Sequence, residues 1–161
     1  MKEMNKDGLL LCELQAQTFE LSVDETQVSS EIFIRRFMNS QIVKMIDRET
    51  ILETTMQPKD LLDEIEEQYG ASHYGSVKYT KNEMYWIGYL YRYFSYTYDF
   101  SSGQVYKIVK GKELREQFLA YHTMDTAQAI ERILEAKGML SDGDSEIKRQ
   151  YEIFRKIREE Q

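Results

Sequence analysis

Apolar residues recur through most of the chain at the spacing that places them on one face of an α-helix. One proline and eight glycines among 161 residues disfavour a protein built from many short strands and turns. The pattern therefore predicts an all-α protein. We expect a single compact helical domain of six to eight helices in residues 1–140. A short linker and a charged C-terminal helix in residues 141–161 would pack on this domain or extend from it.

The most distinctive stretch is residues 79–100, YTKNEMYWIGYLYRYFSYTYDF, which contains the only tryptophan. Thr80 and Glu83 have the spacing of a capping box, which predicts a helix from Lys81 to Tyr98. Aromatic and apolar residues occupy nearly the whole circumference of this helix, as is typical of a helix with neighbours on most sides. We therefore expect it to be the central helix, with Trp86 largely buried.

The other helices follow from the same periodicity and from local start and stop signals. Pro58 suits the first position of a helix, and Gly138 suits the position just after a helix end. Loops are predicted at residues 23–28 and 70–79, and a helical turn at residues 50–54. The predicted helices are residues 4–19, 31–47, 58–69, 102–109, 113–120, 126–137 and 145–160.

The formal net charge of −7 is unevenly distributed along the chain. Residues 71–112 carry six basic side chains against only Glu83 and Asp99, and they also contain nine of the twelve tyrosines. A mildly basic, aromatic middle segment with acidic flanks would suit a surface for an anionic partner. The other interpretation, which we favour, is a tyrosine-rich core helix beside a few solvated lysines.

Several functional classes have no support in the sequence. The longest apolar run is residues 9–12, so no membrane span is expected, and the absence of a signal peptide predicts a cytoplasmic protein. No glycine-rich phosphate loop, paired-cysteine site or nucleophile elbow occurs. No metal or cofactor is therefore expected. The closest approach to a metal site is one acidic helical face, interpreted as solvated, at Asp60, Asp63, Glu64 and Glu67.

Arg115 and His122 are the weak candidates for a catalytic pair. The six residues between them match the loose arginine-to-histidine spacing of HEPN ribonucleases, an all-helical family that this segment resembles in that respect. The resemblance implies an RNA-cleaving site. Glu116 stands where that family commonly has asparagine or aspartate. Alternatively, His122 ends one helix and helps a polar turn begin the next.

A helix-turn-helix is a second alternative, in which nucleic acid would be contacted through residues Ser101 to Lys112. The central helix, a three-residue turn and a short helix have suitable lengths. Polar and basic side chains in this stretch suit phosphates and base edges. The acidic net charge and the long aromatic first helix disfavour this interpretation.

A further resemblance involves MYWIGYLYRYFSYTYDFSSGQVYKIV and KELREQFLAYHTMDTAQAIERIL. These segments resemble a small family of bacterial proteins from Gram-positive toxin–antitoxin operons. The resemblance implies an antitoxin, some members of the family being encoded beside ADP-ribosyltransferase toxins. Protein interfaces favour Tyr, Trp and Arg. We therefore expect the partner to bind a partly wet face of the central helix and the lysines near its end: Tyr85, Tyr89, Arg92, Tyr96, Lys107 and Lys110.

Overall fold

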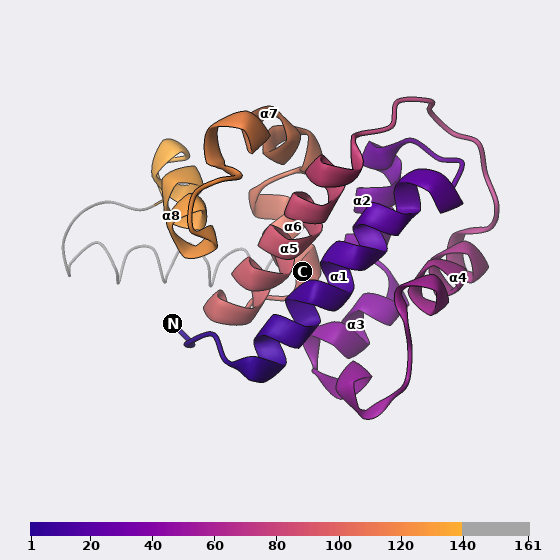
Figure 1. Ribbon diagram of the computed structural model, residues 1–161, viewed down its shortest axis with the longest axis horizontal. Helices are drawn as coiled ribbons and strands as arrows, with labels where there is room; N and C mark the ends of the chain where they lie inside the picture. Colours follow the sequence, from indigo (N-terminus) through magenta and orange to yellow (C-terminus); the bar gives the residue numbers. More distant parts are fainter. Residues whose placement is uncertain (140–161) are drawn as a thin grey trace.

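The computed structural model describes residues 1–139 and confirms the all-α fold class, with eight α-helices and no strand in that range (Figure 1). The predicted linker and C-terminal helix of residues 141–161 lie outside the described residues. A single 3₁₀ turn, η1, spans Thr50–Glu53. The helices are α1 Lys6–Glu25, α2 Ser30–Met38, α3 Gln41–Asp47, α4 Pro58–Tyr69, α5 Lys81–Tyr98, α6 Ser102–Ile108, α7 Gly111–Tyr121 and α8 Thr126–Ala136.

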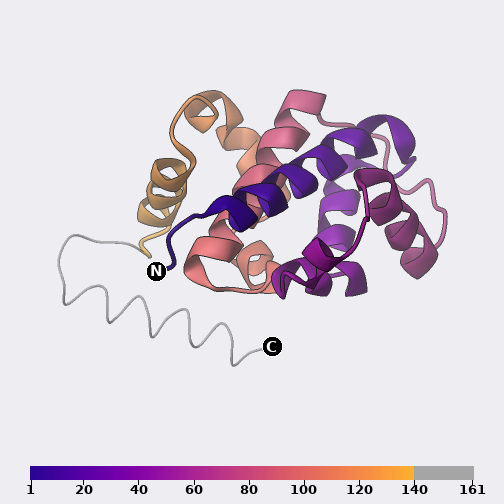
Figure 2. The same ribbon diagram turned by 60° about the horizontal axis from the view of Figure 1, so that its bottom comes forward.

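Helix α5 is central, as its sequence predicts, because α1, α6, α7 and α8 all pack against it. Helix α1 runs antiparallel along α5: Gly8 lies against Tyr96, and Asp24 pairs with Lys81 at 2.7 Å between Oδ2 and Nζ. Figure 2 shows α4 and α8 at opposite extremes of the molecule, whereas α2 and α7 contact each other beside α5. The long helix α1 packs against α5, α4 and α2, so it connects the central helix to α4.

The close approach of α1 to α5 depends on a glycine in the middle of α5. A Cβ added at Gly88 would lie 2.8 Å from Cγ of Phe19 and 3.0 Å from the backbone oxygen of Gln15. Phe19 in turn meets Phe33 and Phe37 of α2 edge-on, with ring centroids 5.5 and 4.9 Å apart. These buried rings connect the α1–α5 pair to the rest of the core.

The predicted helix of residues 31–47 is two helices, α2 and α3, separated at Asn39 and Ser40. The Asn39 amide donates to the Arg35 carbonyl oxygen at 2.8 Å, and the Ser40 hydroxyl donates to the Phe37 carbonyl oxygen at 2.7 Å. Ser40 also accepts from the backbone nitrogen of Val43 at 3.2 Å, which caps α3. These polar side chains occupy backbone groups that a continuous helix would use, so the chain turns here.

Trp86 packs against the core and is mostly buried, in agreement with the prediction, although part of its side chain reaches the surface. Its ring meets Phe118 of α7 edge-on, with centroids 5.8 Å apart. The fully buried aromatic side chains of α5 are instead Tyr91 and Phe94. Trp86 therefore lies where α5 and α7 meet near the surface.

Candidate functional site

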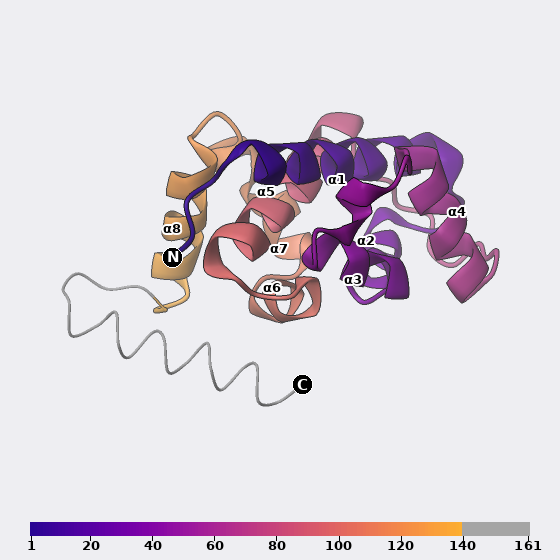
Figure 3. The same ribbon diagram turned by 90° about the horizontal axis from the view of Figure 1, so that it is seen from below.

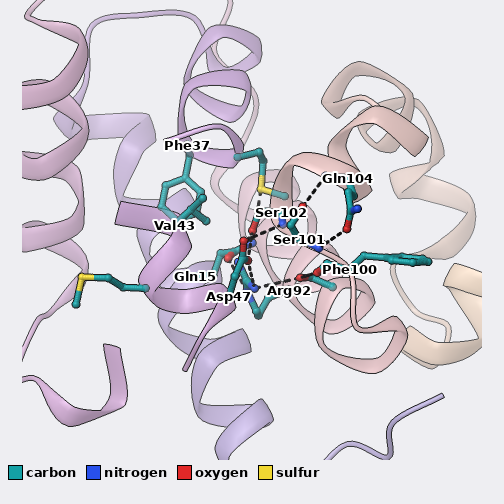
Figure 4. Close-up of polar contacts among 12 residues, drawn as sticks. Gln15, Phe37, Val43, Asp47, Arg92, Phe100, Ser101, Ser102 and Gln104 are labelled. Atoms are coloured by element: carbon teal, nitrogen blue, oxygen red, sulfur yellow. Dashed lines mark hydrogen bonds and ion pairs between the residues drawn. The ribbon is translucent and has the colours of Figure 1, made fainter. Parts of the chain in front are cut away.

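Arg92 is not a surface residue. It is 2% exposed and lies at the centre of a hydrogen-bonded network that Figure 4 shows. Its guanidinium donates to Gln15 Oε1 at 2.9 Å, to Asp47 Oδ1 at 2.8 Å and to Ser102 Oγ at 2.6 Å. These partners come from α1, α3 and α6. The expectation that Arg92 lies on a partly wet face is therefore wrong, because its charge is satisfied inside the protein.

Tyr96 is also covered, by the N-terminal segment and the first turn of α1. Its hydroxyl donates to Asn5 Oδ1 at 2.7 Å, and the Lys2 ammonium lies 3.9 Å from the ring centroid. Tyr96 and Arg92 thus belong to the stripe of α5 that α1 covers. A Cβ added at Gly88, four residues before Arg92, would point in the same direction, toward α1.

The aromatic stripe that α5 turns outward consists of Tyr85, Tyr89 and Tyr93, which we call the tyrosine ladder. All three side chains are half-buried. Successive rings stack, with centroids 6.4 Å apart in both pairs and interplanar angles of 20° and 28°. The i, i+4, i+8 spacing places them one above another on one side of the helix. The sequence predicted Tyr85 and Tyr89 here and missed Tyr93.

The hydroxyl groups of the tyrosine ladder remain protonated at neutral pH. Burial raises the pKa of all three, Tyr85, Tyr89 and Tyr93. The Tyr85 hydroxyl also donates a hydrogen bond to the Glu13 carboxylate of α1, which raises its pKa further. The ladder therefore offers neutral rings with polar edges, which suits recognition by contact better than acid–base chemistry.

Aromatic residues of α7 extend this surface beside the tyrosine ladder. Phe118, which meets Trp86, stacks on the His122 ring with centroids 4.2 Å apart and an interplanar angle of 12°. Leu119 of α7 is 85% exposed and Leu9 of α1 is 45% exposed. Large apolar side chains in such exposed positions favour contact with another molecule.

Lys107 and Lys110 do not lie beside the tyrosine ladder, which corrects the predicted site. Tyr91 is two residues from Tyr89 and therefore points to roughly the opposite side of α5. There its hydroxyl donates to the Val109 carbonyl oxygen at 2.6 Å. The Lys110 ammonium lies near that end, 4.4 Å from the centroid of the Tyr106 ring. The two lysines are exposed, but on the far side of α5 from the ladder.

The structure does not bring Arg115 and His122 together. Both lie on α7, separated by about 10 Å along the helix axis at 1.5 Å per residue. Arg115 Nε bonds to Glu83 Oε2 at 3.3 Å, and its guanidinium lies 4.5 Å from the centroid of the Tyr79 ring. His122 Nδ1 lies 2.7 Å from the Phe118 carbonyl oxygen. Each candidate catalytic group is thus held by a different local contact.

The stretch from Ser101 to Lys112 also has internal roles that compete with nucleic-acid contact. Ser102 is buried in the Arg92 network. Ser101 and Gln104 form the predicted capping box of α6, with bonds of 2.8 and 3.2 Å between side chains and backbone nitrogens. Figure 3 shows the short helix α6 beneath α5, and it also contacts α2 and α3. Its side chains are therefore used mainly for packing.

Within residues 1–139, no group of three or more histidine, cysteine, aspartate and glutamate side chains is placed to hold a metal ion. No helix in the same range is long and apolar enough to cross a membrane.

Of the predicted acidic face on α4, Asp60 accepts a hydrogen bond from the Gln57 backbone nitrogen at 2.7 Å and Asp63 pairs with Lys59 at 3.8 Å.

Comparison with protein-family models, with curated proteins and with solved structures found no match to this chain. The resemblance to antitoxins therefore stays a prediction, and the site must be interpreted from its own chemistry. One signal in the sequence could have identified the outward stripe. Gly88 marks the side of α5 on which another helix approaches closely, so Arg92 and Tyr96 share the covered side and Tyr93 does not.

Proposed function

We propose that this chain is a protein-binding, antitoxin-like component that neutralises a partner toxin. The tyrosine ladder is the observation that carries the proposal: three stacked, half-buried tyrosines lie at the surface beside Trp86 and the aromatic residues of α7. Tyrosine and tryptophan dominate protein–protein hot spots because they bury large rigid areas and keep a polar handle.

The dimensions of this surface suit a macromolecular partner. Tyr85 and Tyr93 are eight residues apart, which is about 12 Å along the helix axis. The exposed side chains of Leu9 and Leu119 add apolar area from two other helices. The partner suggested by the sequence resemblance is a toxin of the ADP-ribosyltransferase type, encoded next to this chain.

Co-expression with the neighbouring gene product tests the proposal. We expect this chain to restore growth to cells that express the toxin, and Tyr89→Leu with Tyr93→Leu to lose that protection. Leucine keeps apolar volume at these half-buried positions, so the double variant should remain folded by circular dichroism. Tyr74→Leu is the matched control, because Tyr74 is 68% exposed in the loop before α5. This control should protect like the unaltered chain.

Three results would contradict the proposal. A folded double variant that still protects cells would show that the tyrosine ladder is not the binding surface. A neighbouring gene product without toxicity would refute the antitoxin function. RNA cleavage by the purified chain, lost in both Arg115→Ala and His122→Ala, would favour the ribonuclease instead.

A further inference from the structure

Four tyrosine rings of this protein each lie beside a cation from the same chain. Lys2 lies over Tyr96, Arg36 over Tyr69, Lys110 over Tyr106 and Arg115 over Tyr79. These distances from the cation to the ring centroid run from 3.9 to 5.3 Å, the range of cation–π contacts. Within residues 1–139, no lysine or arginine lies over a ring of the tyrosine ladder. Among the described residues, the half-buried rings of the ladder therefore have no cation partner of their own.

Three carboxylates act on the tyrosine ladder, and the Lys81 ammonium lies at its N-terminal end, four residues before Tyr85. The negative charges of Glu13 and Glu20 in α1 raise the pKa of Tyr85. The charge of Asp125, at the start of α8, raises the pKa of Tyr89 and of Tyr93. In the part of the chain that the structure describes, none of these three carboxylates forms an ion pair. Elsewhere in the molecule, the positive charges of arginines lie close enough to Tyr69, Tyr79 and Tyr106 to favour a lower pKa of these tyrosines. The tyrosine ladder thus combines aromatic rings that have no cation of their own with an excess of carboxylates over cations.

Of the basic residues close to the tyrosine ladder in the sequence, Lys78, Lys81, Arg92 and Lys110, only Lys81 offsets part of this negative charge. Lys78 donates to the Thr26 carbonyl oxygen at 2.7 Å. Lys81, one turn before Tyr85, pairs with Asp24 and also attracts Glu20, so its single charge is shared between two carboxylates. Arg92 is buried, and Lys110 lies on the other side of α5. Residues 71–112 carry more basic than acidic side chains, but the folded chain places more carboxylates than cations near the tyrosine ladder.

We propose that the tyrosine ladder and its flanking carboxylates bind a segment of the partner protein that is rich in lysine and arginine. This inference rests on the proposed protein-binding function and specifies the chemistry of the partner. Tyrosine rings attract cations through their negative faces, and guanidinium groups stack on them. Glu13, Glu20 and Asp125 would form charge-assisted hydrogen bonds with the same cations. A negatively charged partner, nucleic acid included, would be repelled.

Binding of short labelled peptides to the full-length protein tests this chemistry. The probe is a fluorescein-labelled peptide of alternating arginine and glycine, and the control peptide has glutamate in place of arginine. We expect fluorescence anisotropy to show binding of the arginine peptide alone, weakening as sodium chloride is added because exposed charges are screened. Equal binding of both peptides would overturn the proposal.

Substitutions then locate the peptide on the protein. Tyr89→Leu should weaken binding about threefold, the loss of one exposed cation–π contact, whereas Tyr89→Phe keeps a ring and should bind like the unaltered protein. Glu13→Gln with Asp125→Asn should also weaken binding, and asparagine still caps α8. The matched control is Glu64→Gln with Glu67→Gln, which removes the same charge from exposed positions of α4. The proposal would be overturned if the control variant lost as much affinity for the arginine peptide, or if Tyr89→Leu lost none.

The peptide and growth measurements separate this inference from the proposed function. If the ladder variants abolish protection from the toxin but do not affect peptide binding, the partner is recognised by other chemistry and the inference is wrong. If the arginine peptide binds at the tyrosine ladder but no neighbouring toxin exists, the inference stands and the antitoxin function fails.

Discussion

At the scale of single residues, Arg92 shows that a charged side chain is not always exposed. An arginine among tyrosines indicates an exposed or interfacial residue, yet Arg92 is buried. Its partners Gln15, Asp47 and Ser102 are 77, 45 and 10 residues away in the sequence. No local pattern identifies these partners; the one signal in the sequence for the burial of Arg92 is Gly88, one turn before it on the covered side of α5.

Removing one member of this network should destabilise the fold strongly. Arg92→Met leaves the Asp47 carboxylate partly buried without its cation, so we expect a loss of about 3–5 kcal/mol in the free energy of unfolding. Urea denaturation would measure it. Lys59→Met, which removes an exposed ion pair with Asp63, is the control and should have a far smaller effect.

A double-mutant cycle identifies the source of that loss. Arg92→Met combined with Asp47→Leu should be less destabilised than the two single variants added together, because the second substitution removes the charge that the first leaves unpaired. Strict additivity would show that the two side chains contribute independently, contrary to the observed Nη1–Oδ1 distance of 2.8 Å.

At the scale of elements, helix ends were predictable only where a local signal marks them, and helix faces were not. The first helix was predicted to end at Phe19, but α1 continues to Glu25, into the predicted loop of residues 23–28. The predicted bounds Pro58–Tyr69 and Lys81–Tyr98 match α4 and α5, because proline and the Thr80–Glu83 capping box act locally. The break between α2 and α3 was missed because apolar periodicity continues across Asn39 and Ser40. Which stripe of α5 is covered depends on where α1 lies, and local signals apart from Gly88 do not determine that.

The α1–α5 contact gives a prediction at this scale. Gly88→Ala should destabilise the protein by about 1–3 kcal/mol, although alanine is the better helix former, because the added methyl group would meet Phe19 and the backbone of Gln15. Thermal or urea unfolding would measure the change. Gln17→Ala, at an exposed position of α1, should change stability by less than about 0.5 kcal/mol. A stabilised Gly88→Ala variant would contradict this prediction, because it would show that α1 and α5 can move apart without a loss of stability.

At the scale of the whole molecule, the sign of a surface charge depends on packing and not on neighbouring sequence. The tyrosines and lysines of residues 71–112 suggested a mildly basic aromatic surface. Folding brings α1 and the start of α8 beside the tyrosine ladder, and their carboxylates make that surface acidic. Charge counted along the chain therefore did not identify the carboxylates near the tyrosine ladder, whereas the local aromatic density correctly indicated that α5 is central.

The burial of tyrosines throughout the fold predicts a loss of stability at alkaline pH. Burial raises the pKa of Tyr98 from 10.0 to about 12, and it raises the pKa of Tyr91 well above 10.0. The unfolded chain therefore loses phenol protons at a lower pH than the folded chain. The stabilisation is fully present below pH 10 and is lost as the pH rises through the folded values.

Urea unfolding at a series of pH values would measure this loss, with tyrosinate absorbance followed in the same samples. The free energy of unfolding should fall as the pH rises from 10 toward 12, and phenolate should form together with unfolding. Ionisation of Tyr91 would also remove the hydrogen bond that its hydroxyl donates to Val109. Tyr98→Phe keeps the ring contact with Phe94 but removes one ionisable group, so stability should fall less steeply. Complete phenolate formation in a protein that stays folded would contradict the burial of these hydroxyl groups, because a buried phenolate lacks the solvation that its charge requires.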